Sequence, residues 1–275
     1  RKKSVIIKYQ LKMKNKFLVL TALGLFNFLS AQVASIDFFF IKDGMEKEYL
    51  ELEKVWVEFH KQMIEEGKMF GWSLYKIEST NNVDGDAPDY MTLNRFESKE
   101  AMESMWEGMN YDVFLKIVKK KLKGKMSTKK IKQIVEAKVK ESHHSYLIEL
   151  SDQTLPSVEM NVGEILNVDA MVQRNEDYES LESNFAKPIV QDNVKRGNLR
   201  WWGLTKVIDR NDQAIKEISH FTWQIRVPGK RIKWMSETSK NMFGGEFTFG
   251  KLSEMMGASR DVMGSAKLEL IMKAI

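Results

Sequence analysis

The sequence predicts an α+β protein in which two β-α-β-β-α-β repeats pack sheet to sheet. Three observations support this fold class. A pattern of a glycine, a tryptophan and an L-x-K-[IV] ending occurs twice, in residues 65–77 and 194–207. The segments around both copies alternate between strand-like and helix-like periodicity in the same order. Apolar residues occur on both faces of the expected strands, so each sheet needs a partner for the face that its own helices leave uncovered.

The repeat extends from the shared pattern into the helix before it. Residues 67–77 align with 197–207 with four identities, where average composition would give roughly one. The preceding helices align one residue out of step. We place the slip near Pro188, where a proline disturbs the hydrogen-bond ladder, and expect the second helix to be kinked or shortened. The matched pairs include Trp72 with Trp202, Leu74 with Leu204, Lys76 with Lys206, Tyr49 with Tyr178 and Glu53 with Glu182.

Each element follows from its periodicity. Helices are expected where apolar residues recur every three or four positions, and Gly67 and Gly197 stand where a helix ends. Strands are expected where apolar residues alternate or run together. In the first repeat these are strand 34–42, helix 49–63, strand 71–77, strand 89–98, helix 98–109 and strand 144–150. In the second they are strand 163–173, helix 178–189, strand 201–207, strand 217–227, helix 251–263 and strand 265–271.

Three segments lie between these elements. Residues 81–89 are rich in aspartate, and we expect a turn there and not a calcium loop. Residues 115–141 are expected to form a helical insert, whose part 116–140 holds eleven lysines against one glutamate. A solvated lysine face is the simpler interpretation, and a patch for an anionic surface is the alternative. Residues 228–250 are expected to form a long loop. The predicted domains are a leader over 1–31, a first repeat over 32–155 and a second repeat over 156–275.

The β-α-β-β-α-β order is the ferredoxin-like order. Together with the G-x4-W-x-L-x-K similarity, it makes residues 33–275 resemble the dimeric α+β barrel superfamily. That superfamily includes antibiotic-biosynthesis-type monooxygenases and the stress-responsive, EthD-like and NIPSNAP-like proteins. The resemblance implies that two fused ferredoxin-like units pack sheet to sheet as a pseudo-dimeric barrel around a cavity. A fold of this kind does not by itself define an activity.

The first 32 residues predict export to the periplasm or the exterior. Lys14 and Lys16 precede an apolar run over 17–29 and the small residues Ser30 and Ala31, which is the order of a secretory signal peptide. This run is too short to span a bilayer comfortably. Residues 1–31 hold seven basic and no acidic residues, so the remaining chain has 36 basic and 38 acidic side chains. We therefore expect no nucleic-acid partner and, after cleavage, no transmembrane span.

Polar residues on the expected strands provide the candidate site. His220 and Thr222 share one face of strand 217–227, and this polar stripe either lines the cavity or forms a hydrogen-bonded network. We predict ligand contacts from two tryptophans and from polar strand residues, and we name two histidines and one asparagine as catalytic candidates. The ligand-binding residues are Trp72, Trp202, Thr222, Tyr90 and Thr92, and the catalytic candidates are His220, Asn94 and His60.

Two function classes remain open. The first is an exported protein that binds a small apolar or aromatic ligand in a cavity between the repeats. The second, implied by the resemblance, is a cofactor-independent or haem-linked monooxygenase, since some relatives use an asparagine, a tryptophan and a histidine, types that Asn94, Trp72 and His220 supply. The absence of cysteine excludes thiol catalysis. No motif indicates a metal or another cofactor, and a homo-oligomer is possible.

Overall fold

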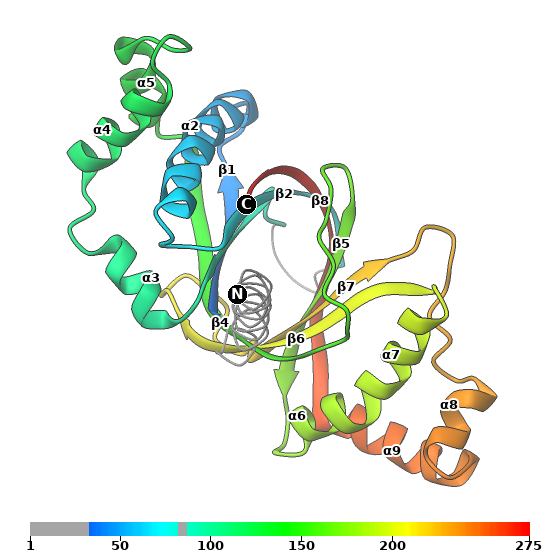
Figure 1. Ribbon diagram of the computed structural model, residues 1–275. Coiled ribbons are helices and arrows are strands. Elements are labelled where there is room, and N and C mark those ends of the chain that lie inside the picture. The colour runs from blue at the N-terminus through cyan, green and yellow to red at the C-terminus, as the bar shows by residue number, and fades with distance from the viewer. Residues whose placement is uncertain (1–32, 82–86) are drawn as a thin grey trace, which may run out of the picture. The chain divides into compact units, whose positions relative to one another are not determined.

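The computed structural model describes residues 33–81 and 87–275. Within them, eight strands close into one barrel in the order β1-β3-β2-β8-β5-β7-β6-β4. Figure 1 looks into this barrel and shows one group of helices on each of two opposite outer sides. No helix of the described residues combines the length and the apolar character that crossing a membrane requires.

The first repeat builds half of the barrel and the helices outside it. Its strands lie in the order β4-β1-β3-β2, which is the ferredoxin-like order. The elements are β1 (Val33–Ile41), α2 (Glu46–Glu65), β2 (Gly71–Thr80), β3 (Tyr90–Phe96), α3 (Lys99–Trp106), α4 (Tyr111–Lys121), α5 (Thr128–Val135) and β4 (Lys140–Gln153).

The second repeat has the same strand order, β8-β5-β7-β6. Its first helix is divided into three consecutive parts. The elements are β5 (Ile165–Gln173), α6 (Tyr178–Leu181), η2 (Glu182–Ala186), α7 (Lys187–Lys195), β6 (Leu199–Arg210), β7 (His220–Arg226), α8 (Glu237–Met242), α9 (Glu246–Ser259) and β8 (Arg260–Ala274).

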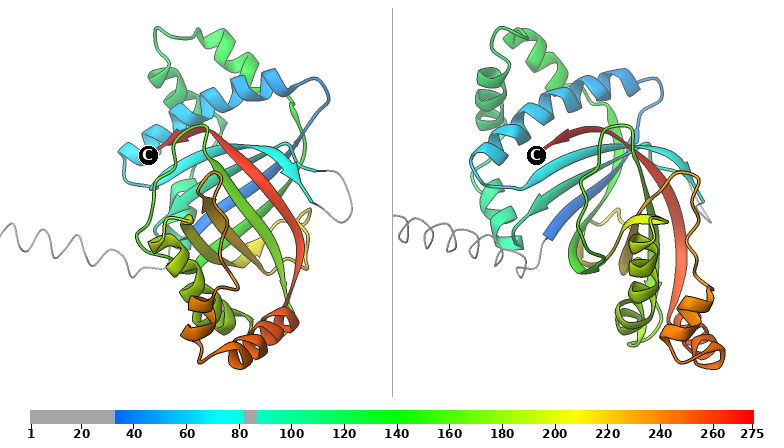
Figure 2. Two further views of the ribbon diagram at one scale, coloured as in Figure 1. Left: turned by 90° about the vertical axis from the view of Figure 1, so that its right-hand side faces the viewer. Right: turned by 45° about the vertical axis from the view of Figure 1, so that its right-hand side comes forward.

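The repeats close the barrel through their outer strands. β2 of the first repeat pairs with β8 of the second, and β6 of the second pairs with β4 of the first, all antiparallel. These pairs satisfy the backbone groups that an edge strand would leave open. The two views in Figure 2 show strands that tilt across the barrel, as closure requires. The predicted α+β fold, two ferredoxin-like repeats in a pseudo-dimeric barrel, is confirmed.

Buried layers inside and outside the barrel hold this arrangement together. The barrel interior joins apolar residues of both repeats, such as Ile36 from β1 and Leu268 from β8. Beneath α2, the outer face of the first sheet packs its own core, which includes Trp72. The second repeat packs two smaller clusters beneath its helices, around Trp202 and around Phe185. Each half of the barrel therefore has an apolar layer on both faces, as the sequence predicts.

A π-helical turn explains the slip between the two repeats. Tyr49 and Gly67 are separated by one residue fewer than Tyr178 and Gly197, and η2 inserts its wider turn between α6 and α7. Pro188 is the second residue of α7, so the donor that it lacks falls at the point where the ladder is already irregular. The interrupted helix contrasts with the continuous α2, which confirms the prediction of a disturbed second helix.

The helix ends follow local chemistry. Gly67 and Gly197 both have φ of 68°, in the left-handed region that glycine enters without steric cost, so the predicted helix stops are confirmed. The side chains of Ser98, Asn110 and Ser127 accept backbone N–H groups at the starts of α3, α4 and α5. These caps divide the chain between β3 and β4, including the lysine-rich insert, into separate short helices.

Two of the expected segments differ from the structure. Residues 260–263 belong to β8 and not to the preceding helix, because the strand continues along β5 through a bulge. The expected loop 228–250 contains α8 and the start of α9. The expected domain boundary after residue 155 falls in the connection between β4 and β5. The predicted leader and residues 82–86 of the expected acidic turn lie outside the described residues.

Candidate functional site

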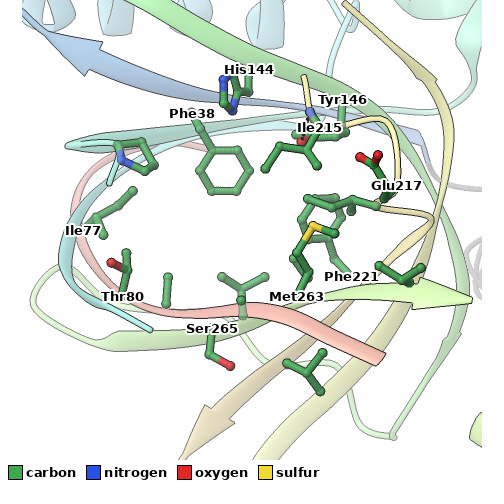
Figure 3. Close-up of a pocket in the computed structure, with 18 of the residues that line it drawn as sticks. Phe38, Ile77, Thr80, His144, Tyr146, Ile215, Glu217, Phe221, Met263 and Ser265 are labelled. Carbon is green, nitrogen blue, oxygen red and sulfur yellow. Dashed lines mark hydrogen bonds between the residues drawn. The ribbon is translucent and has the colours of Figure 1, made fainter. Parts of the chain in front are cut away.

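One end of the barrel holds a cavity of about 1100 Å³. It is lined from both repeats, by strands β1, β2, β4, β5, β7 and β8 and by the segment before β7. Figure 3 shows side chains arranged around this space, with Phe38, Tyr146 and Phe221 along one side and Ile77 and Thr80 on another. We call this space the barrel cavity.

The barrel cavity is asymmetric because the second repeat has small lining residues at positions where the first repeat has large ones. The pairing of β1 with β4 and that of β5 with β8 have the same register around the equivalent residues Asp37 and Asp169. One wall of the cavity is therefore bulky, and the matched wall recedes. The matched lining residues are Phe38 and Ala170, His144 and Gly264, and Tyr146 and Ala266.

An aromatic cluster forms the bulky wall. Phe38 packs edge-on against Tyr146 at 6.2 Å between ring centroids, and Tyr146 packs edge-on against Phe221 at 5.2 Å. The hydroxyl of Tyr146 accepts a hydrogen bond from the backbone N–H of Ile215 at 3.0 Å, which holds the ring in place. Burial raises the pKa of Tyr146 above its usual value. The wall is therefore apolar, fixed and uncharged at neutral pH.

The polar groups of the barrel cavity are few. Burial lowers the pKa of His144, and the neighbouring His143 lowers it further, so the imidazole is neutral at pH 7. Glu141 and Glu217 add carboxylates. In Figure 3, His144 and Glu217 lie on one side of the cavity, and Thr80 lies on another. A neutral imidazole in such a place can accept a hydrogen bond or a proton from a bound molecule.

The site residues predicted for the first repeat do not line the barrel cavity. Trp72, Tyr90, Thr92 and Asn94 lie on the outer face of the first sheet, beneath α2. Trp72 therefore does not face the other repeat. Its strand is buried on both faces, so alternation does not tell which residues point inward. Whether these four residues contact a ligand stays a prediction.

His60 lies in the same outer layer. Its ring stacks on Trp72 at 5.2 Å, and burial lowers its pKa to about 3. The imidazole is thus a neutral packing group in a layer of aromatic rings. Whether it takes part in any chemistry stays a prediction.

The predicted residues of the second repeat lie on the equivalent outer face. His220 is fully buried, with Nε2 3.3 Å from Oε1 of Glu179 and Nδ1 2.9 Å from Oγ of Ser219. Burial lowers the pKa of His220, while Glu179 opposes this shift. His220 and Thr222 both take part in hydrogen bonds on the outer face, and neither lines the barrel cavity. Whether either contacts a ligand stays a prediction.

A network of such hydrogen bonds is present in both repeats. In the first, Thr92 donates to Asp37 at 3.3 Å, and Ser145 donates to the other oxygen of the same carboxylate. The second repeat has the same arrangement around Asp169, so each carboxylate joins three neighbouring strands of its sheet. There Thr222 donates to Asp169 at 3.2 Å, and Ser265 donates to its other oxygen.

A second duplicated feature lies closer to the helices. Glu53 on α2 is buried and lies 3.4 Å from Nζ of Lys140, and its counterpart Glu182 forms an ion pair with Arg260. Burial raises the pKa of Glu53, and Lys140 opposes the shift. The matched tyrosines of these helices are buried as well. The corresponding groups are Tyr49 and Tyr178, Glu53 and Glu182, and Lys140 and Arg260.

In the second repeat this arrangement encloses a cavity of about 120 Å³, the helix–sheet cavity. It is lined by Glu182 and Arg260, and by Trp202 and Thr222 from the predicted ligand-binding set. It lies beneath the π-helical turn, a feature that often accompanies functional sites. Trp202 and Thr222 therefore line a cavity, but within one repeat and not between the two.

Sequence reasoning did not select His144, Tyr146, Phe221 or Glu217 for the site. A signal was present for the first two, because they alternate on one strand and therefore share a face. Phe221 and Glu217 come near that strand only through long-range pairing, because β6 pairs with both β4 and β7. The periodicity within one segment cannot predict such pairing between distant strands.

No protein-family model and no curated protein matches this chain. An anthrone oxidase-like protein of solved structure is 10% identical, with a TM-score of 0.48 over 90% of this chain and 94% of its own. A candidate monooxygenase from Fusobacterium nucleatum is 10% identical, with a TM-score of 0.49 over 90% and 95%. A heme-binding protein from Thermus thermophilus is 12% identical, with a TM-score of 0.41 over 88% and 92%.

At identities near 10%, no residue role, substrate or cofactor carries over from these proteins to this chain. The fold is assigned from the strand order of this chain. The repeated strand order and the closed barrel are those of the dimeric α+β barrel, with two ferredoxin-like copies fused in one chain.

Proposed function

We propose that the protein binds a small apolar or aromatic ligand in the barrel cavity. The observation that carries this proposal is the cavity itself, about 1100 Å³ of space with mostly apolar side chains around it. Ligand sites typically combine an apolar lining with a few polar groups that fix orientation. The aromatic wall of Phe38, Tyr146 and Phe221 supplies the lining.

The test exploits the difference between the repeats. Ala170→Phe places the residue of the first repeat at the matched position of the second, where the ring fills the receding wall. Binding of an environment-sensitive naphthalene dye, followed by fluorescence and by thermal shift, is expected to weaken at least about tenfold, since the ring occupies the space that the ligand needs. Ala170→Leu is expected to give an intermediate loss.

Ile165→Val is the matched control. It makes the same kind of exchange between repeats on the same strand, since Val33 is the corresponding residue, but Ile165 does not line the cavity. Its affinity for the dye should equal that of the unaltered chain. If folded Ala170→Phe protein binds the dye as tightly as the control does, the barrel cavity is not the binding site.

Oxygenation of an aromatic substrate is the second candidate. It is favoured by the neutral imidazole of His144, which lies at the cavity and can take a proton from an acidic aromatic substrate. Haem fits this cavity less well. His144 has the type of an axial ligand, but the carboxylates Glu141 and Glu217 would repel propionate groups. A cofactor-independent reaction with dioxygen is the form that these residues suit.

Oxygen consumption with a panel of phenolic aromatics tests this second candidate. His144→Phe is expected to abolish turnover and to leave substrate binding within about threefold, because it removes the base and keeps an aromatic ring. If no substrate that binds leads to oxygen uptake, the oxygenation candidate is excluded and only the binding function stands. Incubation with haem and an absorption spectrum tests the haem-linked form separately.

Export is a separate proposal that rests on the leader pattern in residues 13–32. Expression of the full chain in a bacterial host, followed by fractionation and intact mass, is expected to give a cleaved protein outside the cytoplasm. A full-length protein retained in the cytoplasmic fraction would contradict it.

A further inference from the structure

We propose that the barrel cavity selects aromatic ligands that carry a cationic group, such as aryl-alkyl amines. This inference rests on the proposed binding function and names the class of ligand. It follows from the charges at the cavity, whose sum is negative.

Four formally charged side chains line the barrel cavity. Arg174 forms an ion pair with Asp261, so these two compensate each other. Glu141 and Glu217 remain, and within the described part of the chain neither forms an ion pair with a basic side chain. Two carboxylates without a cationic partner therefore line a mostly apolar cavity.

The basic group on the aromatic wall does not cancel this charge. The guanidinium of Arg210 lies 5.9 Å from the ring of Tyr146 and donates to the backbone carbonyl of Ile215 at 2.8 Å. These contacts hold Arg210 in place, and it is not among the residues that line the cavity. The net charge of the lining stays negative.

The aromatic wall favours the same ligand. Faces of aromatic rings attract a cation within about 6 Å of the ring centre, and more strongly where water is excluded. The wall offers such rings near Glu217, which Figure 3 shows next to Tyr146. An aromatic body can fill the receding wall at Ala170 while its ammonium group lies near Glu217. An anionic ligand would meet repulsion at the same place.

The experiment compares three ligands with one aromatic body, naphthylethylamine, naphthylethanol and naphthylacetate, titrated into the full chain by calorimetry. The amine is expected to bind tightest and the acetate weakest. Glu217→Gln should reduce the preference for the amine over the alcohol about two- to fivefold, and adding Glu141→Gln should reduce it further. The preference should shrink with added salt, because the carboxylates are exposed.

Asp212→Asn is the matched control. It removes one exposed carboxylate from the same connection between β6 and β7, but Asp212 does not line the cavity. It should leave the preference unchanged, which separates a local contact from a general effect of net charge.

The outcomes distinguish the two proposals. If the alcohol binds as tightly as the amine and Glu217→Gln changes nothing, the inference fails while ligand binding in the cavity stands. If none of the three ligands binds and the dye does not bind either, the proposed function fails and the inference falls with it. Equal effects of Asp212→Asn and Glu217→Gln would also overturn the inference.

Discussion

The imidazole ring of His60 stacks on the indole ring of Trp72, with 5.2 Å between the centroids and 14° between the planes. The histidine comes from α2 and the tryptophan from β2, so the pair joins helix to sheet. Trp56 also stacks on this imidazole, at 5.7 Å. An ionisable side chain thus occupies a place in the core that an uncharged aromatic ring would fill.

This position gives His60 a predictable effect on acid stability. Burial lowers its folded-state pKa to about 3, against about 6.5 when unfolded. As the pH falls, the unfolded chain therefore binds the proton before the folded chain does. The contribution of the neutral ring to the free energy of unfolding is complete above pH 6.5 and is lost as the pH falls towards 3. At pH 7 the free energy of unfolding of His60→Phe is expected to lie within about 1 kcal/mol of that of the unaltered chain. At pH 4.5 the variant is expected to be about 2–3 kcal/mol more stable.

Urea unfolding across this pH range measures the difference. His60→Gln serves as the control, because it also removes the titrating group but loses the ring. Its pH dependence should match that of His60→Phe, at a lower stability throughout. Parallel curves of stability against pH for both variants and the unaltered chain would contradict the lowered pKa.

The π-helical turn predicts an unequal response to deletions. Removing exposed Asn184 together with Pro188→Ala gives the second repeat the same spacing between Tyr178 and Gly197 as the first has between Tyr49 and Gly67. The buried residues before and after the π-helical turn can then still face the core. We therefore expect the free energy of unfolding to fall by no more than about 1–2 kcal/mol. Removing exposed Lys54 from the continuous α2 rotates every later residue by about 100° and is expected to cost several kcal/mol or to prevent folding.

Thermal melting and helical circular dichroism of the two deletion variants provide the comparison. Both variants lack one exposed residue of an equivalent helix. The first is compared with Pro188→Ala alone, so that the π-helical turn is the main difference between the two deletions. Equal losses would mean that the second helix does not contain a removable residue.

The sequence and the structure agree best on element order. The periodicities of Tyr49, Leu52 and Phe59, and the glycines after both helices, depend only on neighbouring residues, and the structure follows them. The direction of strand residues was harder to predict. Trp72 and Tyr75 are both buried but point to opposite faces, because a strand between a helix layer and a barrel interior has no polar face to mark it.

The polar groups show the same limit. Glu53 and Glu182 align in the sequence, but their partners Lys140 and Arg260 lie far along the chain and follow no shared motif. The barrel cavity likewise depends on Ala170. The small size of this residue is informative only when it is compared with the matched residue of the other repeat, Phe38. Size differences between matched positions of the repeats were the available signal for this cavity. They become informative once the register of β5 and β8 is known.

Two residues of β6 are in close contact and differ from their counterparts in the first repeat. A Cβ added at Gly203 would lie 2.5 Å from the Cη2 atom of Trp201, so the indole ring covers the glycine. The first repeat has the opposite arrangement, with Gly71 and Ser73 at the matched positions. The glycine therefore occupies the first of the two positions in the first repeat and the second position in the second repeat.

This contact predicts a strong coupling between the two sites. Gly203→Ser is expected to destabilise the protein by about 1–3 kcal/mol, since a rigid ring must move to admit the side chain. In the Trp201→Gly background the same substitution should cost less than about 0.5 kcal/mol, because the covering ring is gone. Urea unfolding of the four proteins of this cycle measures the coupling. An equal cost of Gly203→Ser in both backgrounds would contradict the contact.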